Sequence, residues 1–457
     1  MAHIAMKRKI TQHLVDWKNR PDHKPLILQG ARQVGKTYIL EEFGREHYKN
    51  YIKVSLDLVP DVRNFLKDNI NPLEIIAYLE TLYNERIVPH ETLVILDEIQ
   101  DCKRALLALK YFQEDYPQYD IVAAGSLLGV AVNQGNKPDE QEEEGKNHLQ
   151  EEEFSYPVGK VDELRLYPMD FEEFLWAINM DVLAQDIRTH FNTDEAMPAS
   201  VHQLALDLYQ RYLIVGGMPE SVYKYVETHS YLECRTVQQS ILVGYNADMA
   251  KYAKPATTVK IRACFNSIPA QLAKENRKFQ YKLAQKGGTA KIFGEAIEWL
   301  ILAGIVHNCK LISHGYIPIS AQEDDSDFKI YMSDIGLLNT KAQMPAQMLL
   351  NSIETENTFL GSVAENYVGQ ALAANGLTLR YWKNGNTQEV EYILQDGMNV
   401  IPVEVKKGKK VNAISMNNFK KTYKCPFAYR ISGKNFGFAN EIKSVPLYAV
   451  FCIEAKD

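Results

Sequence analysis

The sequence has no long apolar run. Its longest nearly unbroken apolar stretch covers residues 297–306, contains Glu298, and is far shorter than the roughly 20 residues needed to cross a bilayer. The basic N-terminus is not followed by an apolar segment of signal-peptide length. We therefore expect a cytoplasmic protein with no membrane partner.

The sequence also lacks metal-binding and disulfide motifs. Its six cysteines are scattered and form no CxxC pair, and its eleven histidines show no ligand spacing. This pattern argues against a zinc site and against a disulfide framework. We expect the cysteines to be reduced residues of the hydrophobic core.

The composition is that of an ordinary globular protein. Of the 457 residues, 46% are apolar and 24% are charged, which excludes a disordered or fibrous protein. At roughly 100–200 residues per domain, this length predicts about three domains. The formal charge of −7 is uneven, because residues 360–457 hold 13 basic and 8 acidic residues, a net +5 that leaves −12 for the rest. Nucleic-acid binding by the whole surface is therefore not expected.

Residues 24–130 alternate short β-branched runs with helical patterns. Strands are predicted at KPLILQG, YIKVSLD, TLVILDEI and YDIVAAGS, and helices at about 36–47, 73–85 and 103–115. Strands separated by helices indicate βαβ units, so the predicted fold class is α/β with a mainly parallel sheet. A run with eight carboxylates and one lysine between residues 139 and 153 follows, and we interpret about 132–153 as an acidic surface insertion.

The remainder of the chain changes character twice. From Pro168 the pattern is helical until Gly216-Gly217, a glycine pair that ends a helix. Residues 261–319 predict two helices and then short strands at IVHNCKLI and YIPIS, an order typical of a winged helix. From about Phe359 we predict a helix, two strands joined by residues 395–399, a basic segment and a final strand PLYAVFCIE. The predicted domains are a core at 1–167, a helical lid at 168–255, a winged helix at 256–345 and another α/β domain at 346–457.

The strongest motif is a complete GxxxxGK[ST] between a predicted strand and a predicted helix, the context that a P-loop requires. Its glycines let backbone N–H groups face the phosphates, Lys36 reaches the β- and γ-phosphates, and the Thr37 hydroxyl ligates Mg²⁺. The sequence therefore predicts ATP and Mg²⁺ as cofactors. The predicted cofactor-binding residues are Gly30, Ala31, Arg32, Gln33, Val34, Gly35, Lys36 and Thr37.

A second acidic motif follows the apolar strand at residues 93–96. Asp97 and Glu98 have the Walker B arrangement, in which Asp97 belongs to the magnesium shell and Glu98 orients or deprotonates the attacking water. This pair predicts hydrolysis as well as binding. A third strand ends at Ser126, whose hydroxyl either senses the γ-phosphate or caps a helix.

These motifs and further strings resemble a known family. The strings are GARQVGKT, LDEIQ, AAGSLLG, YPMDFEEFL, VGGMPESV, LAKENRKFQYKLAQKGG, AIEWLILAGIV and FKIYMSDIGLL. They are similar to the prokaryotic AAA-type ATPases whose C-terminal half is a domain of unknown function with a restriction-endonuclease-like end. The resemblance runs from about residue 24 to residue 406. It implies an ATPase core, a helical lid, a winged helix and a nuclease-like domain. It does not imply a particular substrate.

The C-terminal domain carries a constellation that resembles the PD-(D/E)xK nuclease pattern. Glu365 lies in a predicted helix, Glu391 in the strand QEVEYIL, and Glu404 and Lys406 in the strand IPVEVK. Alternate residues of a strand share a face, so Glu404 and Lys406 point the same way and Glu391 can face them across a hairpin. Such a set could bind one Mg²⁺ and activate water. Glu391 departs from the pattern, which normally has Asp, so the constellation is an active nuclease, a degenerate fold used for binding, or plain surface charge.

Basic residues gather in two places. Residues 406–435 contain nine basic residues and no acidic one, which is compatible with phosphate binding or with a solvated basic face. Lys274, Arg277, Lys278, Lys282, Lys286 and Lys291 accompany the predicted winged helix, which either contacts DNA or acts as a rigid connector. The aromatic residues Tyr423, Phe427 and Tyr429 interleave with the first group, at a spacing more typical of a core than of a stacking platform.

Taken together, these features predict an ATP-binding and ATP-hydrolysing protein whose nucleotide state controls the C-terminal domain. DNA is the expected partner, through the basic segment. An ATP-gated DNA endonuclease, and a regulatory ATP switch that binds a protein partner, are the alternatives. An oligomer is compatible with each of them.

Overall fold

The computed structural model describes residues 6–130, 156–275, 277–385, 388–408 and 414–455. The chain divides into two units. We refer to Arg8–Tyr167 as the N-terminal unit, and to Met1–Lys7 together with Pro168–Asp457 as the C-terminal unit. The predicted acidic insertion at about 132–153 lies outside the described residues.

The N-terminal unit is built on a five-stranded sheet with the order β2-β3-β4-β1-β5, in which every strand pair is parallel. Its strands are β1 (Leu26–Gln29), β2 (Asn50–Ser55), β3 (Thr92–Asp97), β4 (Asp120–Gly125) and β5 (Asp162–Arg165). Its helices are α1 (Ile10–Asn19), α2 (Lys36–His47), α3 (Pro60–Asp68), α4 (Pro72–Tyr83), the 3₁₀-helix η1 (Ile99–Asp101) and α5 (Lys103–Asp115). The predicted α/β class with a parallel sheet is confirmed.

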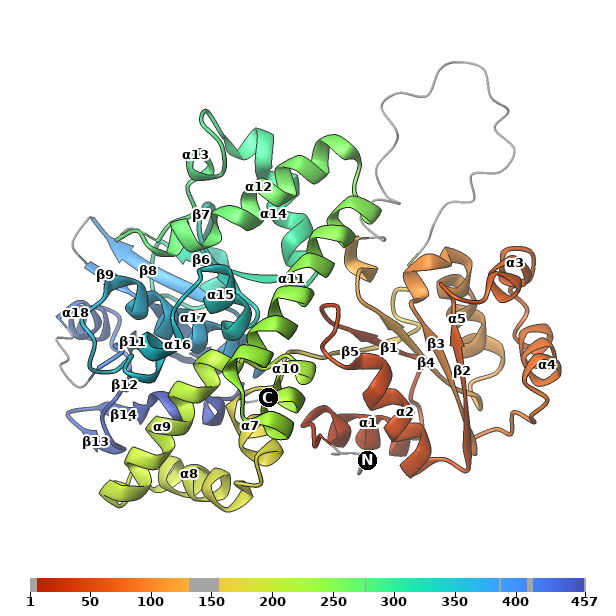
Figure 1. The fold of residues 1–457 in the computed structure, drawn as a ribbon, viewed down its shortest axis with the longest axis horizontal. Helices are drawn as coiled ribbons and strands as arrows, with labels where there is room; N and C mark the ends of the chain where they lie inside the picture. Colours follow the sequence, from red (N-terminus) through yellow and green to blue (C-terminus); the bar gives the residue numbers. More distant parts are fainter. Residues whose placement is uncertain (1–5, 131–155, 276, 386–387, 409–413, 456–457) are drawn as a thin grey trace. The chain divides into compact units, whose positions relative to one another are not determined.

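Helices cover both faces of this sheet, with α1 and α2 on one side and α3, α4 and α5 on the other (Figure 1). Covered parallel strands need apolar side chains on both faces, and β3 and β4 are buried along their whole length. The continuous apolar runs in the sequence therefore form β3 and β4, two interior strands of the order, and residues of the predicted site lie at their carboxyl ends.

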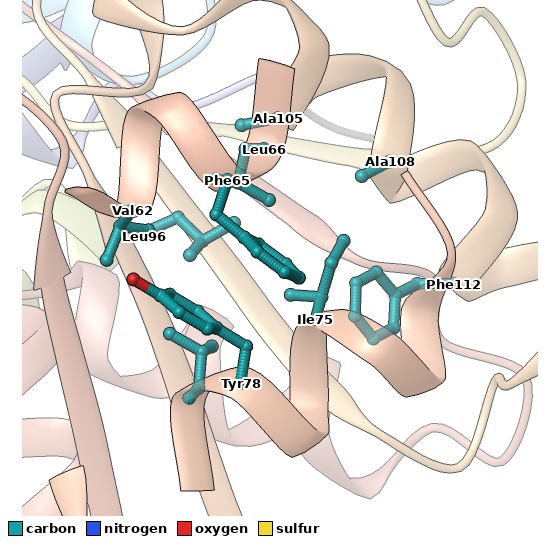
Figure 2. A pocket seen from close by; sticks show the side chains of 10 residues that line it. Val62, Phe65, Leu66, Ile75, Tyr78, Leu96, Ala105, Ala108 and Phe112 are labelled. Atoms are coloured by element: carbon teal, nitrogen blue, oxygen red, sulfur yellow. The ribbon is translucent and has the colours of Figure 1, made fainter. Parts of the chain in front are cut away.

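An apolar hollow of about 310 Å³, including space open to solvent, lies among α3, α4 and α5 (Figure 2). The rings of Phe65 and Tyr78 stack beside it with their centroids 4.1 Å apart. All ten described residues that line it are apolar or aromatic. A phosphate needs donors and positive charge, so this hollow is part of the core rather than a nucleotide site.

The C-terminal unit begins with helices and continues with two sheets. The helices before the first strand are α7 (Phe171–Ala177), α8 (Asp181–Thr193), α9 (Ala199–Val215), α10 (Pro219–Thr228), α11 (Tyr231–Tyr252), α12 (Pro255–Leu272), α13 (Tyr281–Ala284) and α14 (Ala290–Leu302). Those that follow are the 3₁₀-helix η2 (Ile319–Gln322), α15 (Ile335–Lys341), α16 (Ala346–Leu350), α17 (Thr358–Ala374), α18 (Ile414–Thr422) and the 3₁₀-helix η3 (Leu447–Cys452).

The two sheets of this unit have the orders β7-β6-β8-β9 and β10-β11-β12-β14-β13. The strands are β6 (Val306–Ile312), β7 (Glu323–Met332), β8 (Arg380–Asn384), β9 (Gln388–Val390), β10 (Tyr392–Asp396), β11 (Asn399–Val405), β12 (Ala428–Ser432), β13 (Gly437–Ala439) and β14 (Ile442–Pro446). β6 pairs with β7 antiparallel and with β8 in parallel. One sheet thus crosses the predicted boundary between 256–345 and 346–457, and the domain boundaries stay predictions.

Two of the strings in the resemblance meet at a buried turn of this unit. Helix α9 ends at Val215, and Gly216 has a positive φ of 68°. The Asp334 carboxylate caps α15 by accepting from the N–H of Leu337 at 2.8 Å, and it also accepts from the N–H of Gly217 at 2.6 Å. Burial raises the pKa of Asp334 to about 6. A carboxylate that accepts backbone N–H groups offsets that cost and fixes α9 to α15.

Two predicted strands are wrong. The segment YIPIS is not the partner of β6; that partner is the more polar β7, whose Glu323 and Asp325 both pair with Lys310 at 3.0 and 2.7 Å. Cross-strand ion pairs thus compensate for a sequence with little alternation. The segment PLYAVFCIE begins as the end of β14, but its residues 447–452 form η3 and are all buried. A short apolar run that is buried all round cannot be assigned to a strand by periodicity.

Candidate functional site

The loop between β1 and α2 has the backbone of a phosphate-binding loop. Gln33 and Gly35 have φ angles of 66° and 92°, and α2 begins directly after Gly35. A Cβ on Gly30 would come 2.3 Å from the carbonyl oxygen of Leu166, so only glycine fits there. The loop therefore curls tightly over the start of α2, where backbone N–H groups favour an anion.

Lys36 is folded back into this loop. Its side chain is buried, and its Nζ donates to the carbonyl oxygens of Gly30 and Ala31, both at 2.9 Å. Burial lowers the pKa of Lys36 to about 8, although the charges of Glu98 and Asp97 oppose that shift. The ammonium group is held by dipoles, and a phosphate would supply the full negative charge that it lacks.

The two predicted magnesium ligands are in contact. Thr37 Oγ1, at the start of α2, donates to Asp97 Oδ2 at the end of β3 over 2.8 Å. Burial is the largest cause that raises the pKa of Asp97. Mg²⁺ is usually bound by one or two protein oxygens together with phosphate oxygens and waters, so a hydroxyl and a carboxylate in this position fit the ion.

Glu98 lies at a strained turn directly after β3, with φ of 52°. Its Oε2 accepts from Gln100 Nε2 at 2.5 Å and from Ser126 Oγ at 3.2 Å. Strained backbone concentrates at functional sites, because the surrounding structure must hold it. Ser126 therefore contacts the Walker B glutamate, and its role as a γ-phosphate sensor stays a prediction.

The residues of this site come together because β3, β4 and β1 are neighbours in the parallel sheet. Their carboxyl ends meet at one edge, where ligands of open α/β sheets bind. The P-loop follows β1, Asp97 ends β3 and Ser126 follows β4. The N-terminal unit thus places every predicted Walker residue at the edge that the fold uses for binding.

A second polar site lies in the C-terminal unit, where the chain leaves one sheet for the other. The predicted strand QEVEYIL is broken at Glu391, because β9 ends at Val390 and β10 begins at Tyr392 in a different sheet. Lys406 Nζ lies 3.0 Å from Glu391 Oε1 and 2.8 Å from Glu404 Oε1. Three of the four residues predicted for a nuclease-like site are therefore in contact.

The electrostatics of this second site differ from those of the P-loop. Burial and the charge of Glu391 raise the pKa of Glu404 to about 7. Burial alone would lower the pKa of Lys406, but the charges of Glu391 and Glu404 outweigh it and raise the pKa. Two close carboxylates thus share one ammonium group, the arrangement expected when like charges are forced together.

Arg430 adjoins this site from the neighbouring strand. It lies in register with Glu404 across the parallel β11–β12 pair, so the two side chains emerge on the same face. Within the described part of the chain, Glu404 Oε2 and Arg430 Nε are buried atoms without a hydrogen-bond partner. An unfilled acceptor and an unfilled donor in one place are the groups that a bound ligand would satisfy.

Glu365 belongs to a different cluster. It is 1% exposed, its Oε1 accepts from Lys329 Nζ at 2.9 Å and from the Tyr331 hydroxyl, and its Oε2 pairs with Arg277. Lys329 also pairs with Glu389 at 2.6 Å. The carboxylate of Glu365 is therefore committed to cations of β7 and of the segment before α13, rather than to Lys406.

Several of the basic residues noted in the sequence have partners. Lys278 pairs with Asp327 at 2.6 Å, and Lys420 pairs with Glu441 at 2.8 Å. Lys407 donates to the carbonyl oxygen of Thr355. Lys409 and Lys410 lie outside the described residues. Part of each basic group therefore serves the fold, which leaves a phosphate-binding role for the rest as a prediction.

Sequence reasoning missed Gln100, Lys329 and Glu389. Gln100 could have been found, because it ends the string LDEIQ two residues after Glu98. Lys329 and Glu389 gave no signal, since a lysine in a strand and a glutamate in a hairpin are most often solvated. Only the three-dimensional contacts reveal their role.

Across the described ranges, no group of three or more His, Cys, Asp or Glu side chains is arranged to hold a metal ion. The C-terminal site has two carboxylates, so a divalent ion there would need phosphate or water oxygens as further ligands. No helix in the described ranges is long and apolar enough to cross a membrane.

Comparison with protein families matches three parts of the chain. Residues 22–141 match an AAA domain, residues 206–348 match a domain of unknown function (DUF8612), and residues 360–450 match another domain of unknown function (DUF4143). No curated protein matches the chain.

Three solved structures are similar at low identity. A Walker-type ATPase of Pyrococcus abyssi is 14% identical over 74% of this chain and 96% of its own, with a TM-score of 0.44. A STAND-class signal transduction ATPase from Pyrococcus horikoshii is 10% identical over 82% of this chain and 46% of its own, with a TM-score of 0.26. A RuvB variant of Thermotoga maritima is 15% identical over 66% of this chain and 87% of its own, with a TM-score of 0.27.

These TM-scores are low, so the assignment depends on the AAA match and on the geometry of the Walker residues. The match covers β1, the P-loop, α2, β3 and β4. Those elements supply Lys36, Thr37, Asp97, Glu98 and Ser126. The chain therefore carries an ATPase domain of the AAA, P-loop type.

Proposed function

We propose that this protein hydrolyses ATP and that the nucleotide state of the N-terminal unit controls a nuclease-like, DNA-binding C-terminal unit. The observation that carries the second part is the contact of Lys406 with both Glu391 and Glu404 at 3.0 and 2.8 Å. Clusters of like charges beside an ammonium group, with shifted pKa values, are found most often at functional sites. The proposal includes a winged helix formed by α12, α14, β6 and β7.

In the ATP site, each residue has a role that its position supports. Lys36 leaves the carbonyls of Gly30 and Ala31 and pairs with the β- and γ-phosphates. Thr37 and Asp97 would hold Mg²⁺, which would stabilise the negative charge of the phosphates. Glu98 accepts a proton from the attacking water, and Gln100 fixes its carboxylate by donating to Oε2.

In the C-terminal site, the residues support binding of a phosphodiester more strongly than its cleavage. Lys406 contacts both carboxylates and offsets one of their two negative charges, which reduces the repulsion of an approaching phosphate. The unfilled Nε of Arg430 lies on the face from which Glu404 emerges. Glu391 is longer than the usual Asp, and a displacement near 1 Å can cost about a hundredfold in rate.

A specific observation favours cleavage as a second candidate function. Glu404 Oε2 is buried without a partner in the described part of the chain, as a metal ligand would be before its ion binds. We therefore keep an ATP-gated DNA endonuclease as the alternative. If DNA has no effect, the remaining function is an ATP-dependent switch that binds a protein partner.

We also propose a cytoplasmic location, which fits the six buried free cysteines.

One experiment separates these functions. The affinity for labelled duplex DNA is measured by fluorescence anisotropy with ADP and with a non-hydrolysable ATP analogue, while cleavage is followed in Mg²⁺ and in Mn²⁺. We expect the two nucleotides to change the DNA affinity by a factor of about 5 to 150, the usual range of allosteric coupling. The affinity should also fall steeply as salt rises, because each neutralised phosphate releases counterions.

The controls use variants of each site. Glu404→Ala should abolish any cleavage, and Glu391→Asp should retain or improve it by restoring the usual side-chain length. Arg430→Gln should weaken DNA binding without changing ATP hydrolysis. Absence of both cleavage and DNA binding would overturn the nucleic-acid proposals and leave the switch for a protein partner.

A further inference from the structure

The chain passes between its two units at two points. Lys7 belongs to the C-terminal unit and Arg8 to the N-terminal unit, and the chain returns between Tyr167 and Pro168. The side chain at the first crossing is bonded to the backbone at the second, because Arg8 Nη2 donates to the carbonyl oxygen of Tyr167 at 2.6 Å. The Arg8 residue is only 6% exposed, and its contact with Tyr167 is partly buried.

The same guanidinium group also holds the P-loop. Arg8 Nη1 donates to the carbonyl oxygen of Val34 at 3.0 Å, and Val34 lies between Gln33 and Gly35, which both have positive φ. A planar guanidinium group with fixed donors is suited to bridging two acceptors. One buried side chain therefore joins the phosphate-binding loop to both chain crossings.

The P-loop is packed against the second crossing by backbone contacts as well. The N–H of Leu166 donates to the carbonyl oxygen of Gln29 at 2.7 Å, at the base of the loop. The space above Gly30 is filled by the Leu166 carbonyl oxygen, 2.3 Å from the place of a Cβ. A change in the curvature of the loop must therefore displace residues 166–167 or break the bonds of Arg8.

On the other side of the second crossing, the chain is fixed after a single residue. The N–H of Met169 donates to the carbonyl oxygen of Gly217 at 2.7 Å, and the Met169 carbonyl oxygen accepts from the Tyr212 hydroxyl at 2.6 Å. Only Pro168 separates this anchor from Tyr167, and its ring fixes φ. This crossing is therefore short, and one of its torsion angles is fixed.

The first crossing is looser. Lys7 lies 3.8 Å from Asp181 and 4.4 Å from the ring centroid of Trp176, and its side chain is 65% exposed. Exposed pairs of this kind contribute little energy. A displacement of the P-loop would therefore reach the C-terminal unit mainly through Tyr167, Pro168 and Met169.

We propose that Arg8 is the positioning residue that couples nucleotide occupancy of the P-loop to the C-terminal unit. When Lys36 exchanges the carbonyls of Gly30 and Ala31 for phosphate oxygens, the loop carbonyls are released and the acceptor at Val34 shifts relative to Arg8. Arg8 carries that shift to Tyr167. This inference depends on the proposed nucleotide control of the C-terminal unit, and it names the residue that performs it.

The test measures the arrangement of the two units in the full chain by fluorescence energy transfer. Leu58 and Met398, which are 75% and 84% exposed, are changed to cysteine, one in each unit. The six native cysteines are all buried, so dyes attach to the new thiols. Transfer efficiency is compared between ADP and a non-hydrolysable ATP analogue, each with Mg²⁺ and at saturating concentration.

We expect the transfer efficiency to change between the two nucleotides, and Arg8→Lys to lose most of that change while still binding ATP. Lysine keeps the charge but lacks the planar fork of fixed donors, so it cannot hold the carbonyl oxygens of Val34 and Tyr167 in the arrangement that Arg8 imposes. Arg20→Lys is the matched control and should retain the full change, since Arg20 is a half-exposed arginine of the same unit whose ion-pair partners are Asp162 and, at 3.5 Å, Asp22. A second variant inserts Gly-Gly-Ser between Tyr167 and Pro168, which keeps every side chain and should also abolish the change.

Each outcome decides the inference. A full change in Arg8→Lys, with the analogue bound, would overturn the role of Arg8 and leave nucleotide control intact. Absence of any change in the unaltered chain would overturn nucleotide control itself. If Arg8→Lys does not fold, the insertion variant decides, because a full change there would show that the second crossing does not transmit the signal.

Discussion

Each of the two sites contains a lysine, and the surroundings of the two lysines are opposite. Lys36 is bonded to two carbonyl oxygens, and burial lowers its pKa to about 8. Lys406 contacts two carboxylates, whose charges raise its pKa. The charged form of Lys36 is therefore disfavoured as long as no phosphate is bound, whereas the charged form of Lys406 is stabilised by Glu391 and Glu404. A lysine that contacts only carbonyl oxygens therefore indicates a site for an anion, whereas a lysine that contacts carboxylates is already paired within the protein.

The largest expected effect concerns catalysis in the first site. Glu98→Gln should lower kcat for ATP about 10²- to 10⁴-fold, because a general base contributes that much, while ATP affinity stays near that of the unaltered chain. Lys36→Ala should instead weaken ATP binding, since it removes the counter-charge of the phosphates. Steady-state hydrolysis and nucleotide titration give the two values. Near-normal turnover in Glu98→Gln would show that the base lies elsewhere.

A second prediction tests whether Glu365 belongs to the Lys406 site. Glu365→Gln leaves Lys329, which is fully buried, without one of its two carboxylates, and should destabilise the C-terminal unit by about 3 kcal/mol. It should not alter metal or DNA binding, whereas Glu391→Gln should. The free energy of unfolding of the C-terminal unit is measured from the urea dependence of hydrogen exchange at the backbone amides of α17. If Glu365→Gln abolished Mn²⁺ binding without changing stability, Glu365 would belong to the metal site after all.

The contrast between the two clusters explains what the sequence could and could not predict. The Walker residues were predictable because each follows its own strand, and parallel strands align their carboxyl ends. Glu404 and Lys406 were predictable from the period of a single strand. The partners of Glu365 were not, because Arg277 and Lys329 come from elements that only tertiary packing brings to α17. Ion pairs between residues that are far apart in the sequence produce no periodic pattern in that sequence.

The fold shows the same limit. Continuous apolar runs gave β3 and β4 correctly, since both faces of a parallel sheet are covered. The run at residues 447–452 is equally apolar but forms η3, because it is surrounded by α8, α9 and α17 rather than paired with a strand. β7 was missed for the opposite reason, since ion pairs rather than apolar alternation stabilise its first half.

A third prediction compares the two lysines directly. Lys36→Met removes a poorly solvated ammonium group, so the stability of the nucleotide-free N-terminal unit should be unchanged or higher. Lys406→Met leaves two close carboxylates uncompensated and should cost about 1–3 kcal/mol, less than for a fully buried pair because Lys406 is one-third exposed. Urea unfolding of the nucleotide-free protein, resolved by unit through hydrogen exchange, gives both changes. Equal destabilisation by the two substitutions would contradict the contrast.

A fourth prediction is the pH dependence of each unit. Between pH 8 and 10.5 the unfolded chain keeps a proton on Lys36 that the folded unit has lost, so the free energy of unfolding of the N-terminal unit should rise with pH there. Between pH 4.5 and 7 the folded unit keeps a proton on Glu404 that the unfolded chain has lost, so this contribution to the C-terminal unit should fall as pH rises. Lys36→Met should remove the first slope and Glu404→Gln the second. Slopes of the same sign would refute this assignment.

The smallest expected effect is that of the acidic insertion. Its sequence has eight carboxylates between residues 139 and 153 and few apolar residues, so we expect its deletion to remove little buried apolar surface. Deleting residues 136–153 should change the stability of the N-terminal unit by less than about 0.5 kcal/mol and leave ATP affinity unchanged. Thermal unfolding and nucleotide titration check this, and a large fall in melting temperature would contradict it.

The same deletion asks whether the charge of the insertion acts on the C-terminal unit. Residues 360–457 carry a net charge of +5, opposite in sign to the insertion, so the insertion would compete with DNA for that basic segment. Deletion should then raise the DNA affinity at low salt. The gain should disappear at 1 M salt, because charges farther apart than about 3 Å are screened there. Replacing residues 136–153 with an uncharged linker of equal length is the matched control. A gain that the neutral linker does not reproduce would show that length, rather than charge, limits access to the second site.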